Sequence, residues 1–277
     1  ALVLRRWGMQ PMAGVRLTVI NPDPVAPYTG MLPGHIAGHY PRPALMIDLV
    51  RLARFAGARL ILGRACGLDL AARQVQMDDR PPLAFDVASL DIGITSDLPD
   101  LPGFAGHATS AKPLGAYAER WESFVAAVEA GQERPEVVVL GAGVGGVELA
   151  LAMDHRLRAQ PCRRITLIER GPEALPHLGH AARQRLLAEL SARKIVLMTG
   201  ACTEAVEARA VRLADGQRLP AALVLSAAGS RPQGWLQQSG LHLTEGFITV
   251  DPHLRAQGQP QVFAAGDCAH LAHAPRP

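Results

Sequence analysis

The chain has 277 residues, which is enough for about two domains, and its 48% apolar content supports large buried cores. Its net charge is only +3 and no basic run is longer than Arg163-Arg164, so charge gives little reason to expect a nucleic acid or anionic lipid as partner. No apolar run approaches the roughly 20 residues of a membrane span, so the composition indicates a globular protein.

The first elements along the chain are a strand, a helix and a second strand. Residues 15–21 (VRLTVIN) are predicted to be a strand. Apolar residues then recur at helical spacing, which predicts a helix before a strand at residues 59–62. The stripe of that helix is formed by Leu45, Leu49, Leu52 and Ala56.

The middle of the chain contains a crossing and a long helix. Residues 98–113 (LPDLPGFAGHATSAKP) are rich in Pro and Gly and are predicted to cross between two structural units. An aromatic and apolar stripe at helical spacing follows, which we interpret as core packing, and Gly131 ends that helix. The stripe consists of Tyr117, Trp121, Phe124, Val125 and Val128.

The stretch VVVLGAGVGGVELA at residues 137–150 predicts a buried strand, a tight glycine turn and a helix. Gly141 permits the turn, Gly143 lets a pyrophosphate approach the backbone, and Gly146 lets the helix pack against the strand. The start of the helix offers unpaired N–H groups to phosphate. A second strand at residues 163–169 completes the unit, so we predict dinucleotide binding.

The side chain at the tip of that second strand bears on coenzyme choice. Glu169 falls where a carboxylate accepts the ribose hydroxyls of the dinucleotide, which favours NADH over NADPH. The neighbouring Arg170 leaves NADPH open, because it could meet a 2′-phosphate.

The two halves of the chain match each other without gaps in two places. Residues 15–21 match 163–169 at an offset of 148, and residues 75–93 match 211–229 at an offset of 136. The sequence therefore predicts two copies of one nucleotide-binding unit. At the offset of 148, Ala1 matches Leu149, so we expect the first copy to lack its first strand and phosphate loop. Asn21 stands in place of its ribose-binding acid, and an amide carbonyl can still accept a hydrogen bond.

A second signal lies near the end, in residues 246–271 (GFITVDPHLRAQGQPQVFAAGDCAHL). Residues 262–265 predict a small apolar strand, and Gly266 allows close approach of a ligand to the backbone. Asp267 is predicted to begin a helix and to accept hydrogen bonds from ligand hydroxyls.

Together these segments resemble the pyridine nucleotide-disulfide oxidoreductase superfamily, whose members bind two dinucleotides. The resemblance rests on GAGVGGVELA, on SAAGSRP (226–232) with its counterpart LDIGITSDLP (90–99), and on the segment that ends in GDCA. It covers almost the whole chain. It implies an α/β fold of two Rossmann-like domains with three-layer ββα architecture, binding FAD and NAD(P)H, with the NAD domain inserted in the FAD domain.

The implied domain bounds are 1–111 and 233–277 for the FAD domain and 112–232 for the NAD(P)H domain. The implied cofactors are FAD and NADH, with NADPH second, and the implied catalytic residue is Glu148, although a solvated helix glutamate is the alternative. The expected cofactor-binding residues are Gly141, Gly143, Val144, Gly145, Gly146, Glu169 and Gly229 in the second copy, and Asn21, Pro27, Tyr28, Gly266 and Asp267 in the first.

Within the superfamily, the pattern is closest to type II NADH dehydrogenases and sulfide:quinone reductases. The CxxxxC pair of the disulfide reductases is missing from the sequence, and Val144 stands where sulfide:quinone reductases place a reactive cysteine. PYTGMLPGHIAGHY (27–40) and SLDIG (89–93) are most similar to the flavoprotein module fused to selenophosphate synthetase (selenide, water dikinase). The resemblance implies hydride transfer from NADH to flavin and on to a quinone or small acceptor.

The alternatives are a redox module serving selenium or sulfur metabolism beside a selenophosphate synthetase, and a cofactor-free nucleotide-binding module. In the superfamily that the sequence resembles, the chain continues after the aspartate motif, and this later region often carries homodimer contacts or contacts with a membrane surface. We expect a cytoplasmic protein that is peripheral to the inner membrane where such contacts exist. No metal site is predicted, because pairs such as His35 and His39 lack a completing ligand. Cys66, Cys162 and Cys202 are predicted to be buried apolar groups, and Cys268 to have a pKa lowered by a helix N-terminus while serving a structural role.

Overall fold

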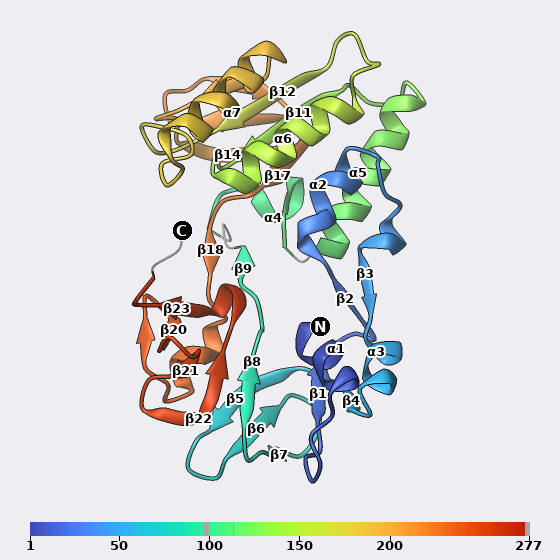
Figure 1. Cartoon of the computed structure of the whole chain (residues 1–277). Coiled ribbons are helices and arrows are strands. Elements are labelled where there is room, and N and C mark those ends of the chain that lie inside the picture. The colour runs from blue at the N-terminus through green and yellow to red at the C-terminus, as the bar shows by residue number, and fades with distance from the viewer. Residues whose placement is uncertain (97–99, 113, 275–277) are drawn as a thin grey trace. The chain divides into compact units, whose positions relative to one another are not determined.

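The computed structural model describes residues 1–96, 100–112 and 114–274, which form two compact units (Figure 1). Unit 1 comprises Ala1–Tyr28, Met46–Ile94 and Arg231–Pro277, and unit 2 comprises Thr29–Leu45 and Thr95–Ser230. Strands β9 (Thr95–Ser96) and β18 (Ser230–Arg231) pair where the chain passes between the units. The bounds that the resemblance implies for the FAD and NAD(P)H domains, at 111/112 and 232/233, concern which cofactor each segment binds. They remain predictions.

Unit 2 is built on a five-stranded parallel sheet. Its strands in spatial order are β10 (Ala108–Ser110), β17 (Leu223–Ser226), β11 (Glu136–Leu140), β12 (Arg164–Ile168) and β13 (Val196–Met198). The central strand β11 is buried on both faces, as its continuous run of valines predicts, with Val138 and Val139 at 0% exposure.

Helices cover one face of this sheet and a small antiparallel sheet covers the other. The helices α5 (Leu114–Glu129), α6 (Val144–Arg156) and α7 (His180–Ala192) share a core with Val137 and Val139. On the opposite face, Val138 and Leu140 pack with α4 (Phe104–His107) and with the sheet of β14 (Thr203–Glu207), β15 (Ala210–Leu213) and β16 (Arg218–Pro220). The result is the three-layer arrangement that the resemblance predicts.

The segment Thr29–Leu45 belongs to unit 2 although it precedes most of unit 1 in the chain. It contains the 3-10 turns η1 (Thr29–Met31) and η2 (Arg42–Leu45) and helix α2 (Leu32–Ile36), which packs on α5 and α6. The buried indole Nε1 of Trp121 donates to the carbonyl of Ile36 at 3.1 Å. The aromatic stripe of α5 is therefore core, as predicted.

Unit 1 repeats the plan of unit 2. Strand β1 (Thr18–Asn21) pairs in parallel with β4 (Arg59–Leu62), and helices α1 (Leu2–Met9) and α3 (Leu49–Phe55) share a small core with one face of this pair. Its antiparallel layer consists of β5 (Ala65–Asp69), β6 (Gln74–Met77) and β7 (Leu83–Ala84).

The rest of unit 1 is a six-stranded sheet and a ribbon. The sheet contains β8 (Ala88–Leu90), β22 (Gln259–Ala264), β21 (Arg255–Ala256), β20 (Phe247–Val250) and β19 (Leu243–Thr244), with β23 (Ala269–Leu271) paired to β20. The 3-10 turn η3 (Gly234–Gln238) precedes it, and β2 (Val25–Pro27) and β3 (Met46–Asp48) form the antiparallel ribbon.

The structure confirms the α/β fold and the duplication. At the offset of 136, β6, β7 and β8 fall on β15, β16 and β17, and at the offset of 148, β1 falls on β12 and α1 on the second half of α6. The equivalent glycines Gly93 and Gly229 both have a positive φ, of 67° and 77°.

Three local expectations were wrong. Helix α3 begins at Leu49, where Asp48 caps it by accepting the backbone N–H of Arg51 at 2.9 Å, and Leu45 lies in the core of unit 2 instead. The predicted crossing at 98–113 contains α4 and strand β10, while its residues 98, 99 and 113 lie outside the described residues. Asp267 begins no α-helix: it lies in the 3-10 turn η4 (Gly266–Cys268), because the following backbone pairs with β20 as β23.

Candidate functional site

The glycine turn of unit 2 connects β11 to α6, and two of its glycines are required by close backbone contacts. A Cβ placed on Gly146 would lie 1.9 Å from the carbonyl oxygen of Gly141. Gly141 itself has a φ of +99°, and a Cβ there would lie 2.9 Å from Cβ of Ala228. Both positions therefore exclude any side chain, which explains the spacing of the motif in physical terms.

The other two glycines of the turn face open space. A Cβ on Gly143 or on Gly145 would meet no described atom within 4 Å. Gly143 is the N-cap of α6, and within the described residues no side chain caps this end of the helix. The first N–H groups of a 13-residue helix therefore point to a space in front of Gly143 that suits a phosphate. Val144 lies beside this space with 46% of its surface exposed.

Glu169, directly after β12, is hydrogen-bonded to the glycine turn. Its Oε2 accepts the backbone N–H of Ala142 at 2.9 Å, and its Oε1 accepts that of Gly171 at 2.8 Å. Each carboxylate oxygen can accept a second hydrogen bond, so Glu169 remains able to bind two hydroxyl groups. Arg170 next to it is exposed.

Two further predicted residues belong to the same end of the sheet. Gly229 follows β17 with a φ of +77°, directly after Ala228, which packs against Gly141. Glu148 lies on the first turns of α6 and is exposed. The structure thus gathers all eight predicted residues of unit 2 at the carboxyl ends of β11, β12 and β17, where open parallel sheets bind their ligands.

The predicted residues of unit 1 lie at the ends of its strands. Asn21 ends β1, and its Nδ2 donates to the carbonyls of Asp23 at 2.7 Å and Val25 at 3.5 Å; neither bond uses the amide carbonyl oxygen, which can itself accept hydrogen bonds. Pro27 ends β2, and Tyr28 follows it with 55% of its surface exposed.

Gly266 and Asp267 follow β22, and both are exposed. Gly266 has a φ of +68°, and a Cβ there would lie 2.6 Å from Oδ1 of Asp91. Asp91 comes directly after β8 and had no place in the sequence prediction. The sequence did contain a signal for Asp91. At the offset of 136 its counterpart in the second copy is Ala227, so the two copies differ here by a charged residue. Ala142, whose N–H binds Glu169, was also missed.

The cysteines differ from the prediction. Cys162 and Cys202 are exposed and Cys66 is half-buried, so their interpretation as buried apolar groups was wrong. Cys268 is buried, as expected of a structural role, but burial raises the pKa of its thiol instead of lowering it. The reason is that no helix begins there, so desolvation of the thiolate dominates.

The side chains of His35 and His39 contact different residues. His35 is buried, its Nδ1 lies 2.9 Å from the carbonyl of Tyr40, and its Nε2 lies 3.4 Å from Oε1 of Glu122. The ring of His39 instead contacts that of His155. Among the described residues, no group of three His, Cys, Asp or Glu side chains is arranged to hold a metal ion.

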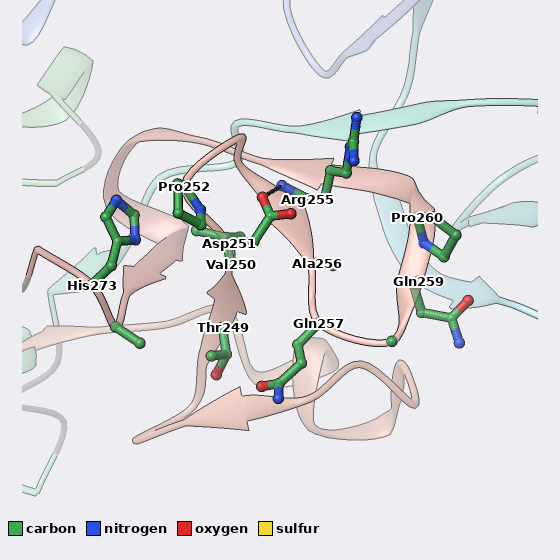
Figure 2. A pocket seen from close by; sticks show the side chains of 12 residues that line it. Thr249, Val250, Asp251, Pro252, Arg255, Ala256, Gln257, Gln259, Pro260 and His273 are labelled. Atoms are coloured by element: carbon green, nitrogen blue, oxygen red, sulfur yellow. Dashed lines mark hydrogen bonds between the residues drawn. The ribbon is translucent and has the colours of Figure 1, made fainter.

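A cavity of about 490 Å³ lies in unit 1 around the β20–β21 turn (Figure 2). Its central carboxylate, Asp251, accepts the backbone N–H groups of His253 and Arg255, at 2.8 and 2.9 Å, and these bonds lower its pKa. Asp251 therefore stabilises the turn, and none of the predicted cofactor residues lines this cavity.

Comparisons with known proteins agree with the fold. The family model of the pyridine nucleotide-disulphide oxidoreductases matches residues 1–276, so the chain belongs to this family. It is 28% identical to the demethylphylloquinone reductase of Synechocystis sp. over 79% of the chain and 56% of the relative. It is 32% identical to the ferredoxin–NAD(+) reductase component of the biphenyl dioxygenase system of Paraburkholderia xenovorans, over 84% of the chain and 56% of the relative.

The fold is also that of a solved NAD-dependent persulfide reductase from A. fulgidus, with a TM-score of 0.81 at 21% identity over 97% of the chain and 51% of that structure. The chain thus spans a little over half the length of the two curated relatives. No helix within the described residues is long and apolar enough to cross a membrane.

Proposed function

We propose that the protein is an FAD-dependent NAD(P)H oxidoreductase that transfers hydride from NADH to flavin and passes the electrons to a quinone or small acceptor. The observation that carries the proposal is the glycine turn of unit 2. Gly146 and Gly141 are in backbone contact, the space before Gly143 is open, and Glu169 is fixed beside it. This arrangement fits the pyrophosphate and one ribose of a dinucleotide.

Each residue of the turn has a distinct task in this proposal. The open Gly143 admits the pyrophosphate to the N-terminus of α6, and Val144 and Gly145 contribute backbone N–H groups. Glu169 accepts the two ribose hydroxyls through the acceptor sites that Ala142 and Gly171 leave free. A carboxylate repels a 2′-phosphate, so NADH is the preferred donor.

The residues of unit 1 are proposed to bind FAD. Asn21 accepts from a ribose hydroxyl, Pro27 and Tyr28 lie along the flavin, and the turn of Gly266 and Asp267 contacts the ribityl or pyrophosphate region. Gly266 suits close approach because its backbone is in the left-handed region. Bound FAD supplies the chemistry, since it accepts hydride from NADH and yields two electrons to the acceptor. Glu148, exposed on α6, is proposed to contact the nicotinamide.

Coenzyme binding is tested by titrating the purified chain with NADH and with NADPH and following nicotinamide fluorescence. We expect NADH to bind at least tenfold more tightly, and Glu169→Ala to remove most of that preference. Glu189→Ala, on α7 and in an exposed pair with Arg193, is the matched control and should change nothing. Equal binding of both coenzymes, or an unchanged preference in the Glu169 variant, contradicts the assignment.

Flavin binding is tested separately, by the visible absorbance of the protein after incubation with FAD and gel filtration. Bleaching of that absorbance by NADH in a stopped-flow instrument, and its recovery on adding a soluble quinone, supports hydride transfer to an acceptor. A colourless protein supports a cofactor-free nucleotide-binding module instead.

The alternative partner is a selenophosphate synthetase. The sequence of residues 27–40 and 89–93 favours it, because these segments resemble the flavoprotein module fused to that enzyme. In this version the electrons serve selenium or sulfur metabolism. The discriminating measurement is NADH oxidation with selenite or polysulfide as acceptor, compared with quinone, in the same preparation. Contact with the surface of the inner membrane and formation of a homodimer are further proposals, tested by vesicle flotation and by light scattering.

A further inference from the structure

Leu175 has an unusual backbone conformation for a buried residue. It lies in the loop between β12 and α7 (Figure 1), its φ is +55°, and only 1% of its surface is exposed. A bulky side chain disfavours this left-handed region. The other described residues that have a positive φ without being glycine are not buried; they are Arg73, Lys194, Glu245 and Leu254. Such a conformation persists only where the surroundings enforce it, and functional sites are where it gathers.

Two contacts enforce the conformation of Leu175. Its side chain belongs to the core cluster of unit 2 that also contains Ala142 and Val147. Its backbone N–H donates to the carbonyl of Ala142 at 3.0 Å. Ala142 is the residue between Gly141 and Gly143. The loop after β12 is therefore hydrogen-bonded to the middle of the glycine turn.

The hydrogen bond from Leu175 fixes the orientation of one peptide group. The carbonyl of Ala142 and the N–H of Gly143 belong to the same trans peptide unit, which is planar, so they point in opposite directions. A carbonyl that is held toward Leu175 therefore directs the N–H of Gly143 away from Leu175. Among the hydrogen bonds of the described residues, none uses this N–H, and a Cβ on Gly143 would meet open space. The N–H is thus available to a ligand.

Glu169 acts on the preceding peptide group in the same way. Its Oε2 accepts the N–H of Ala142 at 2.9 Å, so both backbone groups of Ala142 are held by residues that follow β12. Two consecutive peptide groups of the glycine turn are then fixed. One is fixed by Glu169, which the sequence motif contains, and the other by Leu175, which it does not.

We propose that Leu175 is a positioning residue for the dinucleotide. Its anchored side chain holds its N–H on the carbonyl of Ala142, and this bond sets the direction of the Gly143 N–H that meets the pyrophosphate. The inference rests on the proposed binding of NADH. It adds to that site a residue that acts through Ala142 instead of touching the coenzyme.

The proposal is tested by NADH titrations of full-chain variants, followed by fluorescence at a temperature at which circular dichroism shows each variant to be folded. Leu175→Ala removes the anchor and should weaken NADH binding about tenfold or more. Leu175→Met keeps the volume of the side chain and should bind within about twofold of the unaltered chain. The matched control is Leu190→Ala, at a residue of the same core that is 2% exposed on α7. It should lose a similar amount of stability and keep its NADH affinity.

A third variant separates stability from binding. Leu175→Gly also removes the side chain, but glycine adopts a positive φ without strain, so this variant should melt at a higher temperature than Leu175→Ala. It should nevertheless lose NADH affinity to a similar extent, because no side chain holds the N–H of residue 175 on Ala142. A Leu175→Gly chain that binds NADH like the unaltered chain overturns the proposal.

Amide hydrogen exchange reports on the bond itself. Relative to the amides of β11, the amide of residue 175 should exchange about tenfold faster or more in Leu175→Ala and Leu175→Gly, but not in Leu190→Ala. Equal acceleration in β11 and at residue 175 indicates general destabilisation and overturns the proposal. A loss of NADH affinity in Leu190→Ala as large as that in Leu175→Ala also overturns it. An unaltered chain that binds no NADH refutes the proposed function, whereas NADH binding that is indifferent to residue 175 refutes only the role of Leu175.

Discussion

Gly146→Ala is expected to destabilise unit 2, although alanine is the better helix former. The residue is the third of α6, where alanine gains about 1 kcal/mol over glycine. The added Cβ would lie 1.9 Å from the carbonyl oxygen of Gly141; the oxygen is part of the backbone and the Cβ is fixed to it, so one segment must move by about 1 Å. Overpacking of this kind costs about 3 kcal/mol at the upper end of its usual range. The net loss is therefore about 2 kcal/mol.

That loss corresponds to a fall of roughly 4–8 °C in the melting temperature. Gly145→Ala is the matched control for stability, because it lies one position earlier in the same helix and its Cβ meets nothing within 4 Å. It should leave the melting temperature unchanged or raise it slightly. Gly143→Ala should fold normally and lose NADH affinity, since its methyl group enters the space assigned to the pyrophosphate. Equal melting temperatures for the Gly146 and Gly145 variants would refute the role of the close contact.

Three further results are expected. Glu169→Gln leaves one side-chain oxygen for the two backbone N–H groups that bind the carboxylate, so it should lose about 1–3 kcal/mol of stability. It should also weaken NADH binding in a fluorescence titration, whereas the exposed Glu189→Gln should change neither stability nor binding. Tyr117→Phe should raise the free energy of unfolding in denaturant by about 1 kcal/mol, because the Tyr117 hydroxyl is buried without a partner among the described residues. The exposed Tyr40→Phe should be neutral, and a loss of stability in the Tyr117 variant would show that the hydroxyl has a partner. Burial raises the pKa of Cys268, so the folded state retains the thiol proton and stability should fall as the pH rises above about 8.5; an identical alkaline slope in Cys268→Ala would contradict this.

The glycine turn shows how far local pattern predicts a site. The contact between Gly146 and Gly141, the open position of Gly143 and the ties of Glu169 to the turn all follow from spacing along a strand, a turn and a helix. The two ungapped matches between the halves then predicted the strands of unit 1, because a duplicated sequence repeats its register. Family membership was predictable because the motifs that carry the resemblance are short runs of neighbouring residues.

Other features depended on contacts between distant residues. Leu45 keeps helical spacing with Leu49, yet it packs in unit 2 while Leu49 packs in unit 1, and no local pattern encodes that choice. Asp267 was predicted to cap a helix, but residues 269–271 pair with β20, so their backbone groups are not available to a helix.

The sequence by itself thus determined the repeated unit, the glycine turn and the acid that serves it, because these depend on neighbours within one strand–turn–helix. Only the tertiary structure decided which cysteines are exposed and that Asp91 stands beside Gly266. Burial and strand order arise from which segments pack together, and the residues that supply those neighbours lie far away along the chain.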